Sequence, residues 1–402
     1  MKQIVTFESL ATLGYAALLA AAAHNARAQT FTEPLVLNQA AADDVLVSPF
    51  ASSELLLSAR TADFGRTVLA ADFIASPPIV TPLDSQIGES PYARRLGLAP
   101  TSGALFSVGS VNGANWIAWH VRRSLDGGAS WVTVDPGWQL ASGAAASASG
   151  CAADTNGNVF VSGWAYDKAT SPKQKIFWIV RISSDLGNTW TTLKFGSGPS
   201  DTAAAIHFMP VPADQRHLGG VFAVGRIGAA ATVMRTRNGG LNWTTVGSWS
   251  FRGDAIATAL TSDAQGNLYV GGIAQSSKSG GPYNWFVRLS TDGGDTWTNL
   301  GSPLPAGSDN RLNAVAVDGA GNLWAVGVQA YNTSSQAWVM QRWSPAMGWK
   351  PVPYYPYGSP GTQPVSGATG ASADPVTGDV FVTGSVKDTA GQSHATVWRI
   401  SN

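Results

Sequence analysis

The chain contains 402 residues, of which only 12% are charged, and its 25 basic residues balance its 25 acidic residues. This composition gives no electrostatic basis for binding nucleic acid or an anionic membrane surface. The single cysteine, Cys151, excludes an intrachain disulfide and a cysteine metal cluster, while abundant glycine and tryptophan suit short strands joined by tight turns.

Residues 1–28 have the features of an export signal. Lys2 precedes an apolar run from Ala11 to Ala23, and Ala26-Arg27-Ala28 forms a small-x-small cleavage site. The run is too short to cross a bilayer comfortably, although an uncleaved anchor is the alternative interpretation. We therefore expect cleavage near Ala28 and an extracytoplasmic mature chain, secreted or periplasmic, without a membrane span.

A turn motif then recurs along the chain. It is written Ser-x-Asp-x-Gly-x-Ser/Thr-Trp and joins two strand-like runs, because aspartate accepts hydrogen bonds from downstream amides and glycine tolerates positive φ. Copies begin at Ser124, Ser183, Thr236 and Ser290, and a degenerate copy begins at Thr61. We predict a structural role for their acidic, amide and aromatic residues: Asp63, Asp126, Trp131, Asp185, Trp190, Asn238, Trp243, Asp292 and Trp297.

A second pattern lies between these turns. It reads Asp-x-x-Gly-Asn, followed by an apolar strand and another glycine, and it begins at Asp154, Asp263 and Asp318, with a longer copy at Asp374. The two patterns repeat every 55 residues or so, and a repeat of about 40 to 55 residues with several short strands is typical of a propeller blade. Each repeat then holds four strands in an antiparallel meander.

The Ser-x-Asp-x-Gly-x-Thr-Trp turn resembles the Asp-box, or BNR repeat, of sialidases and several other secreted β-propeller families. The resemblance covers most of the chain beyond residue 60 and implies a sialidase-like propeller. The Phe/Tyr-Arg-Ile-Pro motif of true sialidases is missing, and the nearest segment is Pro91-Tyr92-Ala93-Arg94-Arg95-Leu96. No sialidase catalytic residue can therefore be assigned in this chain.

Residues 29–402 are expected to form one all-β propeller domain, with seven blades favoured and six as the alternative. The last repeat ends before its fourth strand, so we expect a strand at residues 31–37 to close the ring. The blades are expected at approximately residues 38–75, 94–135, 145–196, 200–248, 252–301, 308–353 and 365–402.

The meander places both recurring turns on one face of the ring. The loops from second to third strand, and those between blades, lie on the opposite face, which we call the variable face because its sequences differ, as is typical of a binding surface. Asp201, Asp254 and Asp309 precede the innermost strands and are predicted at the channel mouth on this face. They would act as a catalytic acid and base, bind Ca²⁺, or cap their own loops. Apart from that ion, we predict no metal and no cofactor.

The favoured function is non-catalytic recognition of a glycan, or of another surface polymer or protein, by a monomer. The expected ligand-binding residues are aromatic or basic and lie on the variable face: Trp164, Tyr166, Arg252, Tyr283, Arg311, Tyr331, Tyr354, Tyr355 and Tyr357. One alternative is a sialidase-like or glucanase-like glycoside hydrolase that uses two of the three acids. Another is a scaffold in a surface protein assembly, since the fold alone does not fix the function.

Overall fold

The computed structural model describes residues 30–31, 35–37, 41–47, 54–60, 66–72, 79–86, 92–113, 116–168, 174–196, 198, 201–210, 219–278, 280–302, 304, 309–332, 335–352, 367–374, 376–387 and 392–401. Strands dominate these ranges, and none of them contains a helix long and apolar enough to cross a membrane. The export signal expected at residues 1–28 lies outside the described residues.

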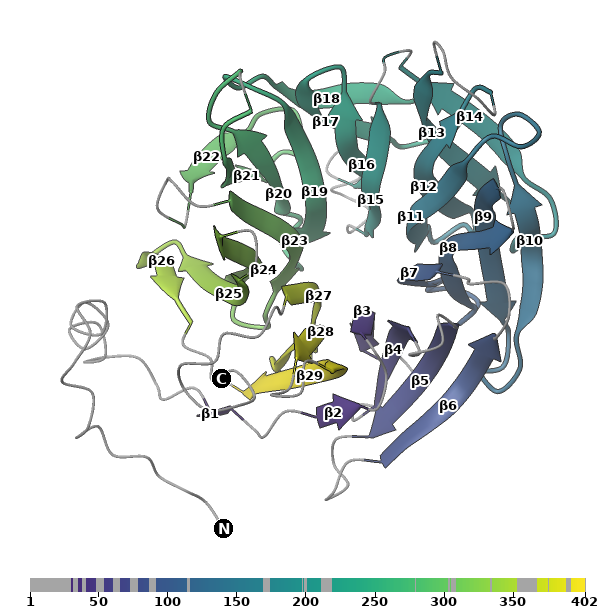
Figure 1. Ribbon diagram of the computed structural model, residues 1–402, viewed down its shortest axis with the longest axis horizontal. Helices are drawn as coiled ribbons and strands as arrows, with labels where there is room; N and C mark the ends of the chain where they lie inside the picture. The colour runs from purple at the N-terminus through teal and green to yellow at the C-terminus, as the bar shows by residue number, and fades with distance from the viewer. Residues whose placement is uncertain are drawn as a thin grey trace.

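The described strands form seven antiparallel sheets arranged as a ring, which is a seven-bladed β-propeller (Figure 1). In each blade the chain runs from the innermost strand outward. The innermost strands are β3(Ala41–Val47), β7(Tyr92–Leu98), β11(Ala146–Ala153), β15(Thr202–Met209), β19(Ala255–Ser262), β23(Asp309–Val317) and β27(Gly367–Ala373). The second strands are β4(Glu54–Arg60), β8(Leu105–Gly113), β12(Val159–Tyr166), β16(Gly220–Ile227), β20(Leu268–Gln275), β24(Leu323–Asn332) and β28(Val380–Lys387).

The outer half of each blade follows the same order. The third strands are β5(Arg66–Asp72), β9(Trp116–Ser124), β13(Ile176–Ser183), β17(Ala230–Thr236), β21(Tyr283–Ser290), β25(Ser335–Ser344) and β29(Ser393–Ser401). The outermost strands of the first six blades are β6(Ile79–Gln86), β10(Val132–Trp138), β14(Thr191–Phe195), β18(Thr244–Trp249), β22(Thr298–Gly301) and β26(Gly348–Pro351).

The N-terminal segment supplies the outermost strand of the last blade. β1(Thr30–Phe31) and β2(Leu35–Leu37) both pair antiparallel with β29, with Thr30 opposite Ser401 and Leu35 opposite Val397. The predicted seven blades and the predicted closure by a strand near residues 31–37 are both confirmed.

The first blade differs from the expectation in its internal assignment. Residues 54–60 form the second strand, because Ala41–Val47 already forms the innermost one. The degenerate motif that contains Asp63 therefore falls in chain order between the second and third strands, and not between the third and fourth. The blade also extends beyond residue 75, since Ile79–Gln86 forms its outermost strand. Asp63 itself lies outside the described residues.

Buried apolar side chains gather between blades, and the described residues form one such cluster at each of the seven interfaces. Large aromatic side chains of the third strands fill several of them. Trp119 and Trp338 are fully buried, and their indole N–H groups donate to the carbonyls of Trp164 and Ser385 in the next blade, at 3.1 and 3.0 Å. Burial of apolar area stabilises by about 25 cal/mol per Å², so stacking of blades carries much of the stability.

The Ser-x-Asp turns have one repeated hydrogen-bond pattern. In the turn at Ser183, the Oγ atom donates to Asp185 Oδ1 at 2.7 Å and accepts from Gly187 N at 2.6 Å. Asp185 then accepts from both the amide and the hydroxyl of Thr189. These bonds lower the pKa of Asp185 to about 2. Both carboxylate oxygens are thus engaged inside the turn, and Trp190 at its end donates to Val134 O of the preceding blade at 3.2 Å.

Candidate functional site

Every innermost strand has a register irregularity at the same place. One residue has no partner on the second strand, although its neighbours are paired. We call these seven residues the bulge ring: Asp43, Arg94, Ser149, Ala204, Thr258, Asn313 and Thr369. A β-bulge inserts one residue into a strand and redirects its side chain. Each blade therefore contributes one such residue at an equivalent position.

The glycine that ends the second sequence pattern lies opposite the bulge. At Gly327 an added Cβ would stand 1.9 Å from the Arg311 carbonyl oxygen, and at Gly163 it would stand 2.1 Å from that of Ser147. Gly225, Gly272 and Gly384 face equivalent carbonyls. The bulge pushes this carbonyl toward the second strand, and a residue without a Cβ leaves room for it.

Part of the bulge ring holds neighbouring blades together. Three of its side chains each donate to the carbonyl that precedes the bulge of the next blade: Thr258 to Leu312 at 2.7 Å, Asn313 to Ala368 at 2.7 Å, and Thr369 to Ala42 at 2.5 Å. The hydroxyl protons of both threonines are thereby used. What these threonines still offer to a ligand is oxygen lone pairs.

The bulge ring surrounds a cavity of about 530 Å³, which we call the mouth pocket. Its walls come from the beginnings of innermost strands and the ends of second strands, so it lies toward the variable face. Six ring residues line it: Asp43, Ser149, Ala204, Thr258, Asn313 and Thr369. Arg60, Arg95, Thr202 and Trp164 complete the polar and aromatic part of the wall.

Among the described side chains, two arginine–aspartate pairs lie at the mouth pocket and directly beyond it. Arg60 Nε lies 3.0 Å from Asp43 Oδ2, and Arg95 Nη1 lies 3.4 Å from Asp44 Oδ1. Arg95 Nη2 also donates to the Asn313 carbonyl at 3.3 Å. Arg95 thus links the second blade to the sixth across the axis of the ring.

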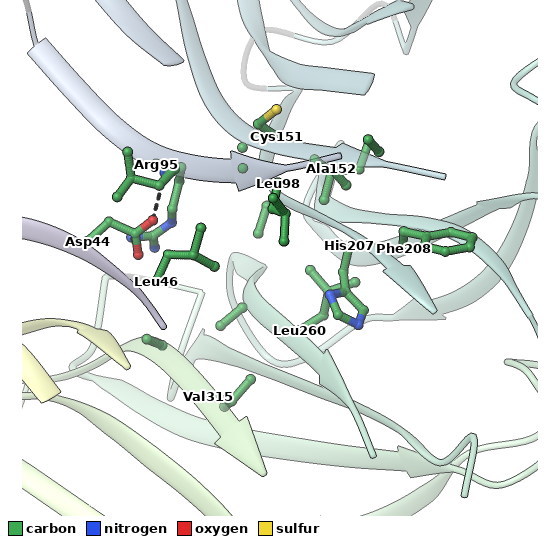
Figure 2. Close-up of a pocket in the computed structure, with 18 of the residues that line it drawn as sticks. Asp44, Leu46, Arg95, Leu98, Cys151, Ala152, His207, Phe208, Leu260 and Val315 are labelled. Carbon is green, nitrogen blue, oxygen red and sulfur yellow. Dashed lines mark hydrogen bonds and ion pairs between the residues drawn. The ribbon is translucent and has the colours of Figure 1, made fainter. Parts of the chain in front are cut away.

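A second cavity of about 410 Å³ lies beyond Arg95, toward the face of the recurring turns; we call it the apolar chamber (Figure 2). Arg95 and Asn313 line both cavities, so the two are ends of one channel. Leu46, Leu98 and Leu260 line the chamber and point into the same open space in Figure 2.

The titratable groups of the apolar chamber are neutral or paired near pH 7. Burial raises the pKa of the Cys151 thiol to about 12 and lowers the pKa of His207 to about 4. His207 Nε2 lies 2.9 Å from Ser262 Oγ. Burial raises the pKa of Asp44, and the Arg95 guanidinium opposes that rise. Asp44 accepts hydrogen bonds from Leu96 N at 2.8 Å and from Arg95.

The three predicted acids precede or begin successive innermost strands, but they do not come together in either of these two cavities. Asp201 is 1% exposed and accepts from Gly198 N at 2.6 Å and Gly228 N at 2.7 Å. Asp254 pairs with Arg226 at 3.1 Å. Asp309 accepts from Tyr283 N at 3.1 Å. None of the three lines the mouth pocket or the apolar chamber.

Of the predicted ligand-binding residues, some lie at the mouth pocket and others lie away from both cavities. Trp164 lines the mouth pocket, and Tyr166 packs edge-on against it with ring centroids 5.6 Å apart. Arg252, Tyr283 and Arg311 line neither cavity, and Arg311 lies 3.7 Å from Asp309. The side chain of Tyr331, and all of Tyr354, Tyr355 and Tyr357, lie outside the described residues.

No group of three or more His, Cys, Asp and Glu side chains suited to hold a metal occurs in the described part of the chain. The calcium ion considered at the channel mouth therefore has no ligand cluster among those residues. What a ligand would meet there is a mixture of hydroxyl, amide, carboxylate, guanidinium and indole groups.

Sequence reasoning missed the bulge ring, Arg60 and Arg95. A signal exists, because Ser149, Thr258 and Asn313 each lie at the same distance before the glycine that ends the second pattern. It is hard to recognise because the ring residues differ in type from blade to blade. The adjacent acids Asp43 and Asp44 also make their strand hard to predict from the sequence, since aspartate is depleted in strands.

No family model and no curated protein matches the sequence. Solved structures do resemble the fold. An oligogalacturonate lyase in complex with manganese superposes with a TM-score of 0.56 at 14% identity, covering 93% of this chain and 96% of that one. The GH74 enzyme of Niastella koreensis gives 0.54 at 16% identity, covering 89% of this chain and 54% of that one. A Trypanosoma rangeli sialidase in complex with the inhibitor DANA gives 0.48 at 14% identity, covering 81% and 56%.

This chain spans a little over half the length of the GH74 and sialidase structures. The similarity to the lyase and GH74 structures establishes a β-propeller fold. At such identities it establishes the fold alone, because one fold supports many functions.

Proposed function

We propose that this protein is an exported glycan-binding propeller that holds a hydroxyl-rich sugar in the mouth pocket. The observation that carries the proposal is the bulge ring, which surrounds one cavity with polar groups from most of the blades. A volume of 530 Å³ suits a small ligand or the end of a longer one, because ligand pockets span about 300–1,000 Å³.

The hydrogen-bonding character of the ring favours a ligand that donates. Thr258 and Thr369 have given their hydroxyl protons to the next blade and can only accept. Sugar hydroxyls both donate and accept, so they can donate to these threonines and accept from the arginine side of the pocket. A ligand that only accepts, such as sulfate, would find no free donor in these two threonine hydroxyls.

Trp164 supports the same conclusion. Its indole stands at the wall of the mouth pocket and is braced edge-on by Tyr166. A rigid aromatic face beside hydroxyl acceptors suits the apolar C–H face of a pyranose ring. The named activity of the lyase structure concerns a carbohydrate, which is consistent with this proposal.

Ala204 offers a direct test. It lines the mouth pocket, so Ala204→Trp fills the pocket and removes no polar contact. We expect glycan binding to weaken by about tenfold or more, since a loss of about 1.4 kcal/mol corresponds to that factor. Calorimetric titration would measure it, with ligands found by screening an array of neutral and carboxylated oligosaccharides.

Ala129→Trp is the matched control, because Ala129 is exposed in a turn on the opposite face. It should bind glycan as the unaltered protein does. Absence of binding across the array, or equal binding by the two tryptophan variants, would contradict the proposal and favour a scaffold role.

The hydrolase alternative is less well supported with the acids predicted for it. The carboxylates of Asp201, Asp254 and Asp309 are engaged by loop amides or by arginine and face neither cavity. Incubation with any glycan that binds, followed by analysis for shorter products, distinguishes a binding protein from an enzyme.

A further inference from the structure

The channel has two ends of different chemistry, and the apolar chamber is separate from the proposed glycan site. We propose that the apolar chamber is a second binding site, which takes a neutral apolar group such as a short alkyl chain or a single aromatic ring. Its ligand would enter from the face of the recurring turns, where Pro100, Thr155 and Pro210 line the chamber.

Size and lining support a ligand of this class. The chamber has a volume of about 410 Å³, whereas an engineered apolar cavity of about 150 Å³ is known to bind benzene. Leu46, Leu98, Leu260 and Val315 come from four different blades and line it together. A guest buries apolar surface against these side chains, and the hydrophobic effect favours that burial.

The titratable groups that line the apolar chamber disfavour an ionic ligand. Arg95 and Asp44 face each other at the inner end, with Nη1 and Oδ1 3.4 Å apart, and Asp44 also accepts from Leu96 N. His207 is occupied by Ser262 at 2.9 Å, and the Cys151 thiol is protonated because burial raises its pKa to about 12. An ammonium or carboxylate entering the chamber would lose water and find no unmatched partner, which is costly.

Two adjacent alanines of the β15 bulge separate the two sites. Ala204 lines the mouth pocket, and Ala205 lines the apolar chamber. A large side chain at each position therefore fills one cavity and leaves the other open. Ala371 of β27 also lines the chamber and provides a second position for filling it.

The experiment titrates hexan-1-ol, hexanoate and hexylammonium into the full protein by calorimetry at pH 7. Hexan-1-ol should bind the unaltered protein and Ala204→Trp equally. The affinity for hexan-1-ol should fall by about tenfold or more in Ala205→Phe and in Ala371→Leu. Hexanoate and hexylammonium should bind the unaltered protein about tenfold or more weakly than hexan-1-ol does.

Glycan binding should persist in Ala205→Phe. A negative result for the apolar chamber is therefore distinguishable from a negative result for the glycan site. Three results would overturn the inference: no hexan-1-ol binding up to its solubility limit, unchanged binding in both filled variants, or equal binding of the charged probes. If Ala205→Phe folds poorly, Ala371→Leu and the comparison of hexan-1-ol with the two charged probes still test the proposal.

Discussion

At the scale of single residues, His207 shows how the channel fixes a protonation state. Its ring lines the apolar chamber beside Leu260, and burial lowers its pKa from 6.5 to about 4 (Figure 2). In the unfolded chain the same imidazole has its ordinary pKa. Between these two values the unfolded state binds a proton that the folded state does not.

The protein should therefore lose stability as the pH falls from 6.5 toward 4, and part of that loss should belong to His207. We expect His207→Gln to reduce the difference in unfolding free energy between pH 7 and pH 4.5, measured by urea denaturation. Carboxyl groups also titrate in this range, so the informative quantity is the difference between variant and unaltered protein. An identical pH dependence in both would contradict the assignment.

The aspartates of the recurring turns behave differently. Hydrogen bonds from Ser130 and Ser124 lower the pKa of Asp126 to about 2, and Asp185 has a similar value. Their contribution to stability is present above pH 4 and disappears as the pH approaches 2. These turns therefore stay intact across the range in which His207 titrates.

At the scale of the element, the bulge and its facing glycine form one unit. The sequence repeats the glycine because the bulge brings a carbonyl oxygen to the place where a Cβ would lie. In six blades the bulge residue lines the mouth pocket. Blade stability and pocket lining thus depend on the same local irregularity.

Gly327→Ala tests this unit. A Cβ there would stand 1.9 Å from the Arg311 carbonyl oxygen, so the strands must separate or the bulge must shift. We expect a loss of about 2 kcal/mol or more in unfolding free energy by urea denaturation. Gly321→Asn is the control, because Gly321 has open space around it at φ 78°, a conformation that Asn adopts more readily than most residues. Equal effects of the two substitutions would contradict the role of the bulge.

At the scale of the whole molecule, stability depends on closing the ring. The N-terminal strand pairs with β29, and Leu37 is buried in the cluster between the last blade and the first. The hydrogen bonds from Thr258, Asn313 and Thr369 also run from blade to blade toward this closure. Segments from the two ends of the sequence therefore form the interface between the last blade and the first.

Leu37→Asp should weaken the closure strongly. Leu37 is 5% exposed, and an unpaired carboxylate at that position costs about 3 kcal/mol or more. Thermal unfolding should show a lowered transition temperature or a separate early transition of the terminal blades. Leu241→Asp is the control, since Leu241 is 83% exposed in a turn and should tolerate the change. Identical melting of both variants would show that closure contributes little.

The sequence by itself determined the seven-bladed propeller, its closure near residues 31–37 and the segregation of recurring turns from variable loops. These follow from local chemistry, since a Ser-x-Asp or Asp-Gly-Asn turn satisfies its own hydrogen bonds wherever it occurs. The degenerate motif of the first blade is the exception, because it lies between the second and third strands, and the motif alone does not indicate which strands flank it.

Only the tertiary structure decided what lies in the channel. Arg60, Arg95, Asp43 and Asn313 come from three blades and share no motif, yet ring closure brings them to one axis. The predicted acids had the right spacing, but backbone amides engage Asp201 and Asp309, and Arg226 engages Asp254. Spacing along a chain specifies the depth of a side chain in its blade, whereas its direction and partners depend on bulges and on neighbouring blades.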